Sequence, residues 1–452
     1  MALETRRWVR TLRIAAVPAR SVGRLAVGQA GRLRGEDPGE VRRRVRQANA
    51  DDLRTVLGDL KGGALKLGQF LSTVDSLFPP DPEATWQDAL TQLQEANPGL
   101  PFDDVEPVLR AELGPDWRSR FRGFDERPAA AASLGQVHRA QWVDGRPVAV
   151  KIQYPGVRES VAADLRTLGA SLRLASVVAR GLVVPPVMHE LSTRLGEELD
   201  YRREAAHQRV FAAAYRDDPG TAVPDVVDAT ERVLVMDWLP GRPLVDTAGD
   251  TDDARARTGL AYQVFLLEAP ARTGLLHADP HPGNFRVLDD GRLGVLDFGA
   301  VVPMPGGLPP SFGRLVSAFA YERGAALESS LRDAGLVRPG RRLDTESLAE
   351  VMSPFSEPAR HEVFTYSPEW LRSCFDRNAQ ARDPDYTVAL GLTLPPDQLM
   401  TQRVWLGCVG TLCRLGVTVP VRPVLRRYLP GFTEPGGPPD GPPDGAGISS
   451  PG

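Results

Sequence analysis

The first regular pattern along the chain is a stripe of apolar residues that begins at Leu53. Apolar side chains stand at positions 53, 57, 60, 64, 67, 71 and 74, in alternating steps of four and three residues. This spacing places them on one face of an α-helix, and Phe78-Pro79-Pro80 ends the pattern, because proline does not continue a helix. The sequence therefore predicts an amphipathic helix here, whose apolar face needs a partner surface.

The pattern changes to period two between residues 126 and 155, which indicates β-strands. One run ends at Trp142 and the next begins at Val148, with the pair Asp144-Gly145 between them. Because Asp-Gly is a favoured hairpin turn, these two runs predict a β-hairpin.

Helical patterns follow near 157–180 and 186–217, and a strand from Arg232 to Met236 leads into the chain reversal Trp238-Leu239-Pro240-Gly241. Residues beyond 300 read as helices and proline-rich loops. We expect an α+β, two-lobed fold resembling a protein kinase. Its parts are a basic arm (1–50), a helical extension (51–125), a small β-containing N-lobe (126–240), a mainly helical C-lobe (241–430) and a disordered Pro/Gly tail (431–452).

Composition adds a local charge asymmetry to this picture. The chain has 452 residues and a net charge of −4, but residues 1–50 hold 12 arginines and 4 acidic residues (+8), which leaves about −12 on the rest. The arm lacks the apolar run of a secretory signal. We expect a solvated arm, or one that contacts a membrane surface or an acidic partner. Nucleic-acid binding is not expected, because few aromatic residues interleave the arginines.

Two further features bear on the compartment. No segment approaches the roughly 18–20 uninterrupted apolar residues of a membrane span, so an integral membrane protein is not expected. The three cysteines, Cys374, Cys408 and Cys413, are too few for a disulfide framework and are predicted to be core residues. We expect a cytoplasmic protein whose membrane contact, if it has one, is peripheral.

The segment from His277 to Asn284 carries the strongest chemical signal. Asp279 precedes Asn284 by five residues, and Asp297 follows thirteen later within Asp297-Phe298-Gly299. A carboxylate near the attacking group and oxygen ligands for Mg²⁺ are what phosphoryl transfer requires. The spacing matches the catalytic and metal-binding residues of protein-kinase-like enzymes. His277 and His281 are predicted to brace the loop, because the prolines at 280 and 282 exclude a helical zinc site.

A kinase also needs a lysine that holds the nucleotide phosphates and an acid that holds the lysine. Lys151, on the second hairpin strand, is one of only three lysines in the chain. Asp200 and Glu204 are four residues apart in a predicted helix and share a face, so either acid has the spacing to reach Lys151. The usual glycine-rich phosphate loop is replaced by Ala129-Ala130-Ala131-Ala132-Ser133, and alanine denies phosphates the close backbone approach that glycine gives.

Together these motifs resemble the ABC1/UbiB (AarF, ADCK-type) family of atypical kinases from about residue 53 to 430. The resemblance rests on the alanine-rich loop, on Lys66-Leu67-Gly68-Gln69 as the family's K-x-G-Q motif, and on Glu198-Leu199-Asp200 as its E-x-D motif. It implies that Lys66 and Gln69 act as regulators with Glu198 and Asp200. It also implies ATP or ADP with Mg²⁺ as cofactors, and a link to membrane lipids and isoprenoid quinones.

The resemblance assigns a role to each candidate residue. It implies catalytic roles for Asp279, Lys151 and Glu204, and metal ligation by Asn284 and Asp297. Nucleotide contacts are implied for Ala131, Ala132, Ser133, Lys151, Met236 and Asp237. The expected function is an atypical kinase or ATPase that acts on a small molecule, a lipid-associated substrate or water. Two alternatives remain open: a phosphotransferase like the aminoglycoside and choline kinases, and a nucleotide-sensing lipid-binding scaffold. The sequence does not indicate an oligomeric state.

Overall fold

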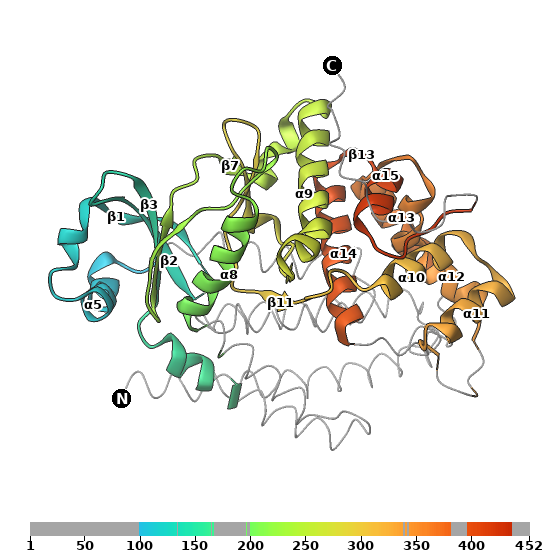
Figure 1. Ribbon diagram of the computed structural model, residues 1–452, viewed down its shortest axis with the longest axis horizontal. Coiled ribbons are helices and arrows are strands. Elements are labelled where there is room, and N and C mark those ends of the chain that lie inside the picture. Colours follow the sequence, from blue (N-terminus) through green and yellow to red (C-terminus); the bar gives the residue numbers. More distant parts are fainter. Residues whose placement is uncertain are drawn as a thin grey trace, which may run out of the picture. The chain divides into compact units, whose positions relative to one another are not determined.

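The computed structural model describes residues 99–132, 134–163, 165–166, 196, 199–337, 340, 343–380 and 396–435 (Figure 1). These residues form two compact units. The first contains the described residues up to Ala206 together with Val226–Trp238, and the second contains His207–Asp225 and the described residues from Leu239 onward. The basic arm, the striped helix, Lys66, Gln69, Ser133, Glu198 and the tail beyond residue 435 lie outside the described residues.

The first unit is built on one antiparallel five-stranded sheet. Its strands, in spatial order, are β1 (Phe121–Ala131), β2 (Gly135–Trp142), β3 (Pro147–Gln153), β6 (Val233–Asp237) and β5 (Val226–Ala229). The predicted hairpin is confirmed as β2 and β3, with Gly145 at a φ of 99° in the connecting turn. The predicted strand at Arg232 to Met236 is confirmed as β6, which pairs with β3.

One strand begins earlier than the sequence pattern indicates. β1 starts at Phe121, before the period-two pattern at 126, and its pairing with β2 contains three register shifts. Because bulges interrupt the alternation of buried and exposed residues, the period of two is not visible in this part of the sequence.

The two faces of the sheet bury different sets of residues. Val148, Val150 and Ile152 of β3 pack with helix α5 (Phe102–Leu113) and the short helix η1 (Trp117–Arg120) in one cluster. Ala149 points to the opposite face and packs with Tyr201 and Ala205, at the beginning of helix α8 (Tyr201–Ala214). Since side chains alternate across a strand, Lys151 shares the face of Ala149.

A series of hydrogen bonds through buried side chains joins Leu100 to strand β2. Gln136 accepts a hydrogen bond from the backbone N–H of Leu100 at 2.7 Å, and its Nε2 lies 2.9 Å from Nε2 of His138. His138 Nδ1 lies 2.8 Å from the Asp125 carbonyl oxygen. Both contacts are satisfied when His138 is neutral, with its proton on Nδ1. Burial lowers the pKa of His138, against the opposing charges of Asp125 and Glu126.

This histidine predicts a pH-dependent stability. Because its folded pKa lies below the unfolded value of about 6.5, the unfolded chain binds the proton more readily. The unfolding free energy should therefore fall below about pH 6.5, by up to about 1.4 kcal/mol per pH unit, and stay level above it. Urea titrations across this range measure the slope. His138→Phe should make it shallower, and a slope equal to that of the wild type would contradict the prediction.

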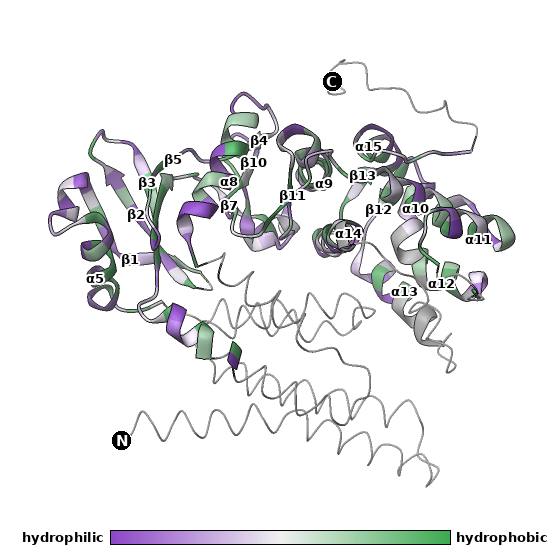
Figure 2. Ribbon diagram, turned by 60° about the horizontal axis from the view of Figure 1, so that its bottom comes forward, coloured by the Kyte–Doolittle hydropathy of each residue, from purple (hydrophilic) through white to green (hydrophobic). Residues whose placement is uncertain are grey.

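The second unit is mainly helical. Its α-helices after α8 are α9 (Asp252–Thr273), α10 (Pro310–Tyr321), α11 (Gly324–Asp333), α12 (Thr345–Ser356), α13 (Pro368–Gln380), α14 (Pro396–Leu415) and α15 (Val421–Tyr428). Its 3₁₀ helices are η2 (Leu244–Gly249), η3 (Pro282–Asn284) and η4 (Pro358–Arg360). None of the helices among the described residues has the length and apolar character needed to cross a membrane; Figure 2 shows hydrophilic and hydrophobic stretches mixed along α10 to α13.

Short strands complete this unit. β4 (Thr221–Ala222), β10 (Leu293–Val295), β9 (Phe285–Val287) and β7 (Arg242–Pro243) form one sheet. β8 (Leu275–His277) pairs with β11 (Val301–Pro303), and β12 (Val363–Thr365) pairs with β13 (Thr418–Pro420). A β-containing unit and a mainly helical unit confirm the predicted α+β, kinase-like fold.

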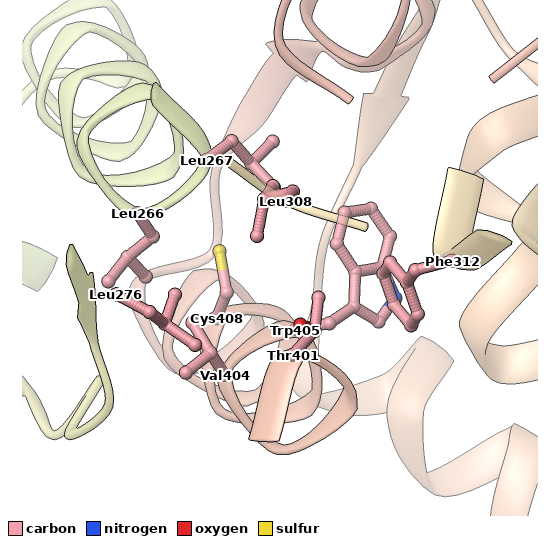
Figure 3. A pocket seen from close by; sticks show the side chains of 9 residues that line it. All are labelled: Leu266, Leu267, Leu276, Leu308, Phe312, Thr401, Val404, Trp405 and Cys408. Carbon is pink, nitrogen blue, oxygen red and sulfur yellow. The ribbon is translucent and has the colours of Figure 1, made fainter. Parts of the chain in front are cut away.

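The core of the second unit lies around α9 and α14. Figure 3 shows side chains from these helices, from α10 and from β8 around a small apolar cavity, with the thiol of Cys408 on its wall. Cys374, Cys408 and Cys413 are all buried and reduced, which confirms their prediction as core residues. Burial raises the pKa of the Cys408 thiol, so this group is a poor nucleophile.

Candidate active site

The first unit contains a buried ion pair. The ammonium of Lys151 donates to both carboxylate oxygens of Glu204, at 2.7 and 2.9 Å. Lys151 is 7% exposed and Glu204 is 5% exposed. Lys151 comes from β3 and Glu204 from α8, whose first turn covers that face of the sheet. Of the two acids with the required spacing, Glu204 is the one that makes this contact.

The prediction that Asp200 lies within the same helix is wrong. α8 begins at Tyr201, and the Asp200 carboxylate accepts the backbone N–H of Arg202 at 3.0 Å, as a helix-capping residue does. The Arg202 guanidinium donates to both oxygens of Asp200 at 2.9 Å. Hydrogen bonding from Arg202 is the main reason that the pKa of Asp200 lies below its ordinary value.

Of the described residues predicted to contact the nucleotide, Ala131, Lys151, Met236 and Asp237 lie on the sheet of the first unit, and Ala132 directly follows β1. Ala131 ends β1, and the Ala132 N–H donates to the Gly135 carbonyl oxygen at 2.8 Å, which closes the alanine-rich loop into a tight turn. Met236 is buried on β6 opposite Ala149 of β3. Asp237 follows it and lies 3.6 Å from the Arg146 guanidinium. Ala131 and Met236 thus lie on strands of one sheet, with β2 and β3 between them.

In the second unit, the chain from 277 to 284 forms a braced loop. Asn284 Nδ2 donates to Asp279 Oδ2 at 2.8 Å and to the Asp279 carbonyl oxygen at 3.2 Å. The predicted bracing role of the histidines is confirmed for His281, whose Nδ1 accepts the Gly283 N–H at 3.1 Å. Pro280 is held from another direction, since its carbonyl oxygen accepts the buried Tyr262 hydroxyl.

The segment that contains Asp297 runs beside this loop. The Leu296 N–H donates to the Asn284 carbonyl oxygen at 2.9 Å, and His277 Nε2 lies 2.7 Å from the Asp297 carbonyl oxygen. The Asp297 carboxylate accepts the Gly299 N–H at 2.9 Å. These bonds bring Asp279, Asn284 and Asp297 into one braced region, although they span eighteen residues of sequence.

A cluster of buried aromatic rings packs next to Asp297. Phe298 is fully buried, with its ring centroid 4.9 Å from that of Phe211 and 5.7 Å from that of His277. Burial lowers the pKa of His277, so a neutral imidazole donates to the Asp297 carbonyl. The cluster fixes the backbone on either side of Asp297, while its carboxylate remains at the edge of the core.

The donor sets suit a magnesium–nucleotide complex. Mg²⁺ prefers carboxylate and carbonyl oxygens, which Asp297 and Asn284 supply. Because Asn284 donates to Asp279 through Nδ2, its amide oxygen is the side-chain atom suited to metal ligation. A buried ammonium such as that of Lys151 suits phosphate oxygens, and a carboxylate such as that of Asp279 suits a hydroxyl or water proton.

Sequence reasoning missed Tyr201, whose ring lies under the Lys151 ammonium, 5.0 Å from Nζ to the ring centroid. The position of Tyr201, three residues before Glu204, could have indicated this contact, because residues three apart on a helix share a face. Without the contact, a tyrosine at a helix start reads only as a core residue.

The Lys151–Glu204 pair predicts a double-mutant result. Lys151→Met leaves the buried Glu204 carboxylate without its ammonium and should lower the unfolding free energy by about 3–5 kcal/mol. Adding Glu204→Leu replaces the pair with apolar groups and should restore most of this loss. Urea unfolding measures both variants.

Arg110→Met is the matched control, because the Arg110–Glu106 pair is largely exposed and should contribute less than about 1 kcal/mol. Additive effects of the two substitutions at 151 and 204 would show that the pair is not coupled.

A family model described as the ABC1 atypical kinase-like domain matches residues 92–320. The mitochondrial atypical kinase COQ8B of Rattus norvegicus is 36% identical over 258 residues, which cover 56% of this chain and 48% of the relative. The mitochondrial atypical kinase COQ8 of Saccharomyces cerevisiae is 31% identical over 322 residues, which cover 70% of this chain and 63% of the relative. The chain thus spans about half to two thirds of the length of these relatives.

Among solved structures, the complex of Rv3197 from Mycobacterium tuberculosis with erythromycin is similar over 88% of this chain and 100% of that chain. The two share 39% sequence identity, with a TM-score of 0.69.

Proposed function

Because the chain belongs to the ABC1 atypical kinase-like family, we propose that it binds a Mg²⁺–nucleotide complex and catalyses phosphoryl transfer. The observation that carries the proposal is the buried Lys151–Glu204 ion pair, in which the ammonium donates a hydrogen bond to each carboxylate oxygen. Both hydrogen bonds fix the position of the lysine's positive charge. Enzymes accelerate phosphoryl transfer mainly through such fixed charges and through the positioning of the reactants.

Each residue has a role in this proposal. Lys151 holds nucleotide phosphates and Glu204 orients Lys151. Asn284 and Asp297 hold Mg²⁺, which when bound neutralises charge on the phosphates. Asp279 orients the attacking hydroxyl or water and accepts its proton.

The alanine-rich loop bears on the choice of nucleotide. Ala131 and Ala132 carry Cβ atoms where a glycine-rich loop lets phosphates approach the backbone. We propose that the loop therefore contributes less to binding the terminal phosphate, so ATP and ADP bind with similar affinity.

We propose a small or lipid-associated acceptor, or water, with a role in isoprenoid-quinone metabolism and peripheral membrane contact through the arginine-rich arm. The family resemblance supports the quinone role, and the charge of +8 on residues 1–50 supports the lipid contact. A macrolide is a second candidate ligand, because Rv3197 is 39% identical and its structure is a complex with erythromycin.

The experiment uses the purified full chain. Nucleotide-dependent thermal stabilisation with Mg²⁺, and hydrolysis with and without anionic liposomes, are expected in the wild type. Binding without turnover would favour a nucleotide-sensing scaffold, and turnover of an aminoglycoside or choline would favour a phosphotransferase of that type. Stabilisation by erythromycin is measured in parallel. Absence of any nucleotide effect would overturn the proposal.

A further inference from the structure

Tyr201 is the aromatic residue nearest to the charge of Lys151 among the described contacts of that lysine. Its ring centroid lies 5.0 Å from Lys151 Nζ, within the range in which an aromatic face attracts a cation. Tyr201 is 2% exposed and Lys151 is 7% exposed, so water screens this attraction little.

Tyr201 and Glu204 act on the ammonium from one helix. They are separated by three residues at the beginning of α8, so both project from the same face toward β3. Glu204 accepts two hydrogen bonds from Lys151, while the Tyr201 ring offers its π-electrons to the same charge. The lysine is therefore in contact with both a carboxylate and an uncharged ring from the same helix.

The backbone at Tyr201 is held in place by hydrogen bonds, and its hydroxyl is buried close to β2. The Tyr201 N–H donates to the Glu231 carbonyl oxygen at 3.0 Å, and the Gln153 side chain holds the preceding Leu199 carbonyl at 3.0 Å. At the other end, a Cβ on Gly135 would lie 3.0 Å from the Tyr201 hydroxyl oxygen and 2.1 Å from the Ile152 carbonyl oxygen. Gly135 is two residues beyond the end of the alanine-rich loop, so the hydroxyl lies near the start of β2.

We propose that Tyr201 is a positioning residue that keeps Lys151 in place for the nucleotide phosphates; this role rests on the proposed function. A carboxylate competes with phosphate for the ammonium, because both are anions. The ring has no net charge, so it orients the ammonium without cancelling its attraction for phosphate. Tyr201 thus preorganises Lys151 for binding, and its loss acts on nucleotide affinity more than on the chemical step.

The contact can be measured without nucleotide. The chain has only three lysines, so protein labelled with ¹³C at lysine Cε gives a simple NMR spectrum. Protons on Lys151 Cε should show an upfield ring-current shift that Tyr201→Phe keeps and Tyr201→Leu removes. Phe121→Leu is the matched control, because it removes a buried ring from the cluster on the other face of the sheet.

The functional readout is the kinetics of nucleotide turnover by the same proteins. Tyr201→Leu should raise KM for the nucleotide about fivefold with kcat nearly unchanged, and Tyr201→Phe should restore the wild-type KM. Replacement of Tyr201 by fluorinated phenylalanines should raise KM progressively, because fluorine withdraws charge from the ring face while changing its shape little.

Failure of this inference and failure of the proposed function give different results. An unshifted Lys151 signal in the wild type overturns the inference whatever the nucleotide data show. So does a shifted signal with the same KM in Tyr201→Leu as in the wild type. If no variant, including the wild type, binds nucleotide, the proposed function fails and the role of Tyr201 falls with it, even where the ring-current shift is present.

Discussion

Asp279→Asn is expected to lower Mg²⁺-dependent nucleotide turnover by about 10²–10⁴-fold, the usual effect of removing a general base. The amide has the size of the carboxylate but does not accept a proton from a hydroxyl or water. Its oxygen can still accept the 2.8 Å hydrogen bond from Asn284, so the loop should keep its shape. Nucleotide binding should therefore survive while turnover is lost. Steady-state hydrolysis with and without anionic liposomes measures the effect.

Asp289→Asn is the matched control, since it makes the same change of charge at an exposed position of the same unit. It should retain wild-type turnover. Liposome-stimulated hydrolysis that persists in Asp279→Asn would mean that another group removes the proton, or that the activity belongs to a contaminant.

The second large effect is expected at Asp297. Asp297→Asn removes the negative charge that we propose binds Mg²⁺, so nucleotide should no longer raise the melting temperature in the presence of Mg²⁺. In the wild type, a nucleotide concentration of about 100 times Kd should stabilise the fold by about 2.7 kcal/mol. The variant should still fold, because its amide oxygen can accept the Gly299 N–H as the carboxylate does.

The matched measurement is the wild type with a chelator in place of Mg²⁺, which should resemble Asp297→Asn. If the variant is stabilised by nucleotide as strongly as the wild type, Asp297 is not a metal ligand and the assignment of Asn284 loses its support.

Local sequence patterns predicted the parts of the fold that local forces determine. The β2–β3 hairpin followed from alternation and the Asp144-Gly145 turn, because both the pairing and the turn lie within about twenty residues. β1 was harder, since its bulges depend on pairing with β2 and leave no regular period. The three buried cysteines were predictable because a free cysteine packs as a small hydrophobic residue.

The contacts of the candidate site residues were harder to predict than the fold. Spacing alone did not choose between Asp200 and Glu204 as the partner of Lys151. An aspartate at position 200 is compatible with pairing to Lys151 from within a helix and with capping the start of a helix. It caps α8, because hydrogen bonds between Leu199 and Gln153 and between Tyr201 and Glu231 fix the backbone on either side of it. Those hydrogen bonds join segments distant in sequence, so no pattern within the helix reveals them.

The bond between Gln136 and Leu100 has a mechanical consequence. Gln136 lies three residues beyond Ser133, where the alanine-rich loop ends, and Leu100 is the second of the described residues. A force on the backbone at Leu100 would be transmitted to β2 through one amide side chain, with little slack because the side chain is fully buried. Tension at Leu100 would thus become strain in β2 close to the loop.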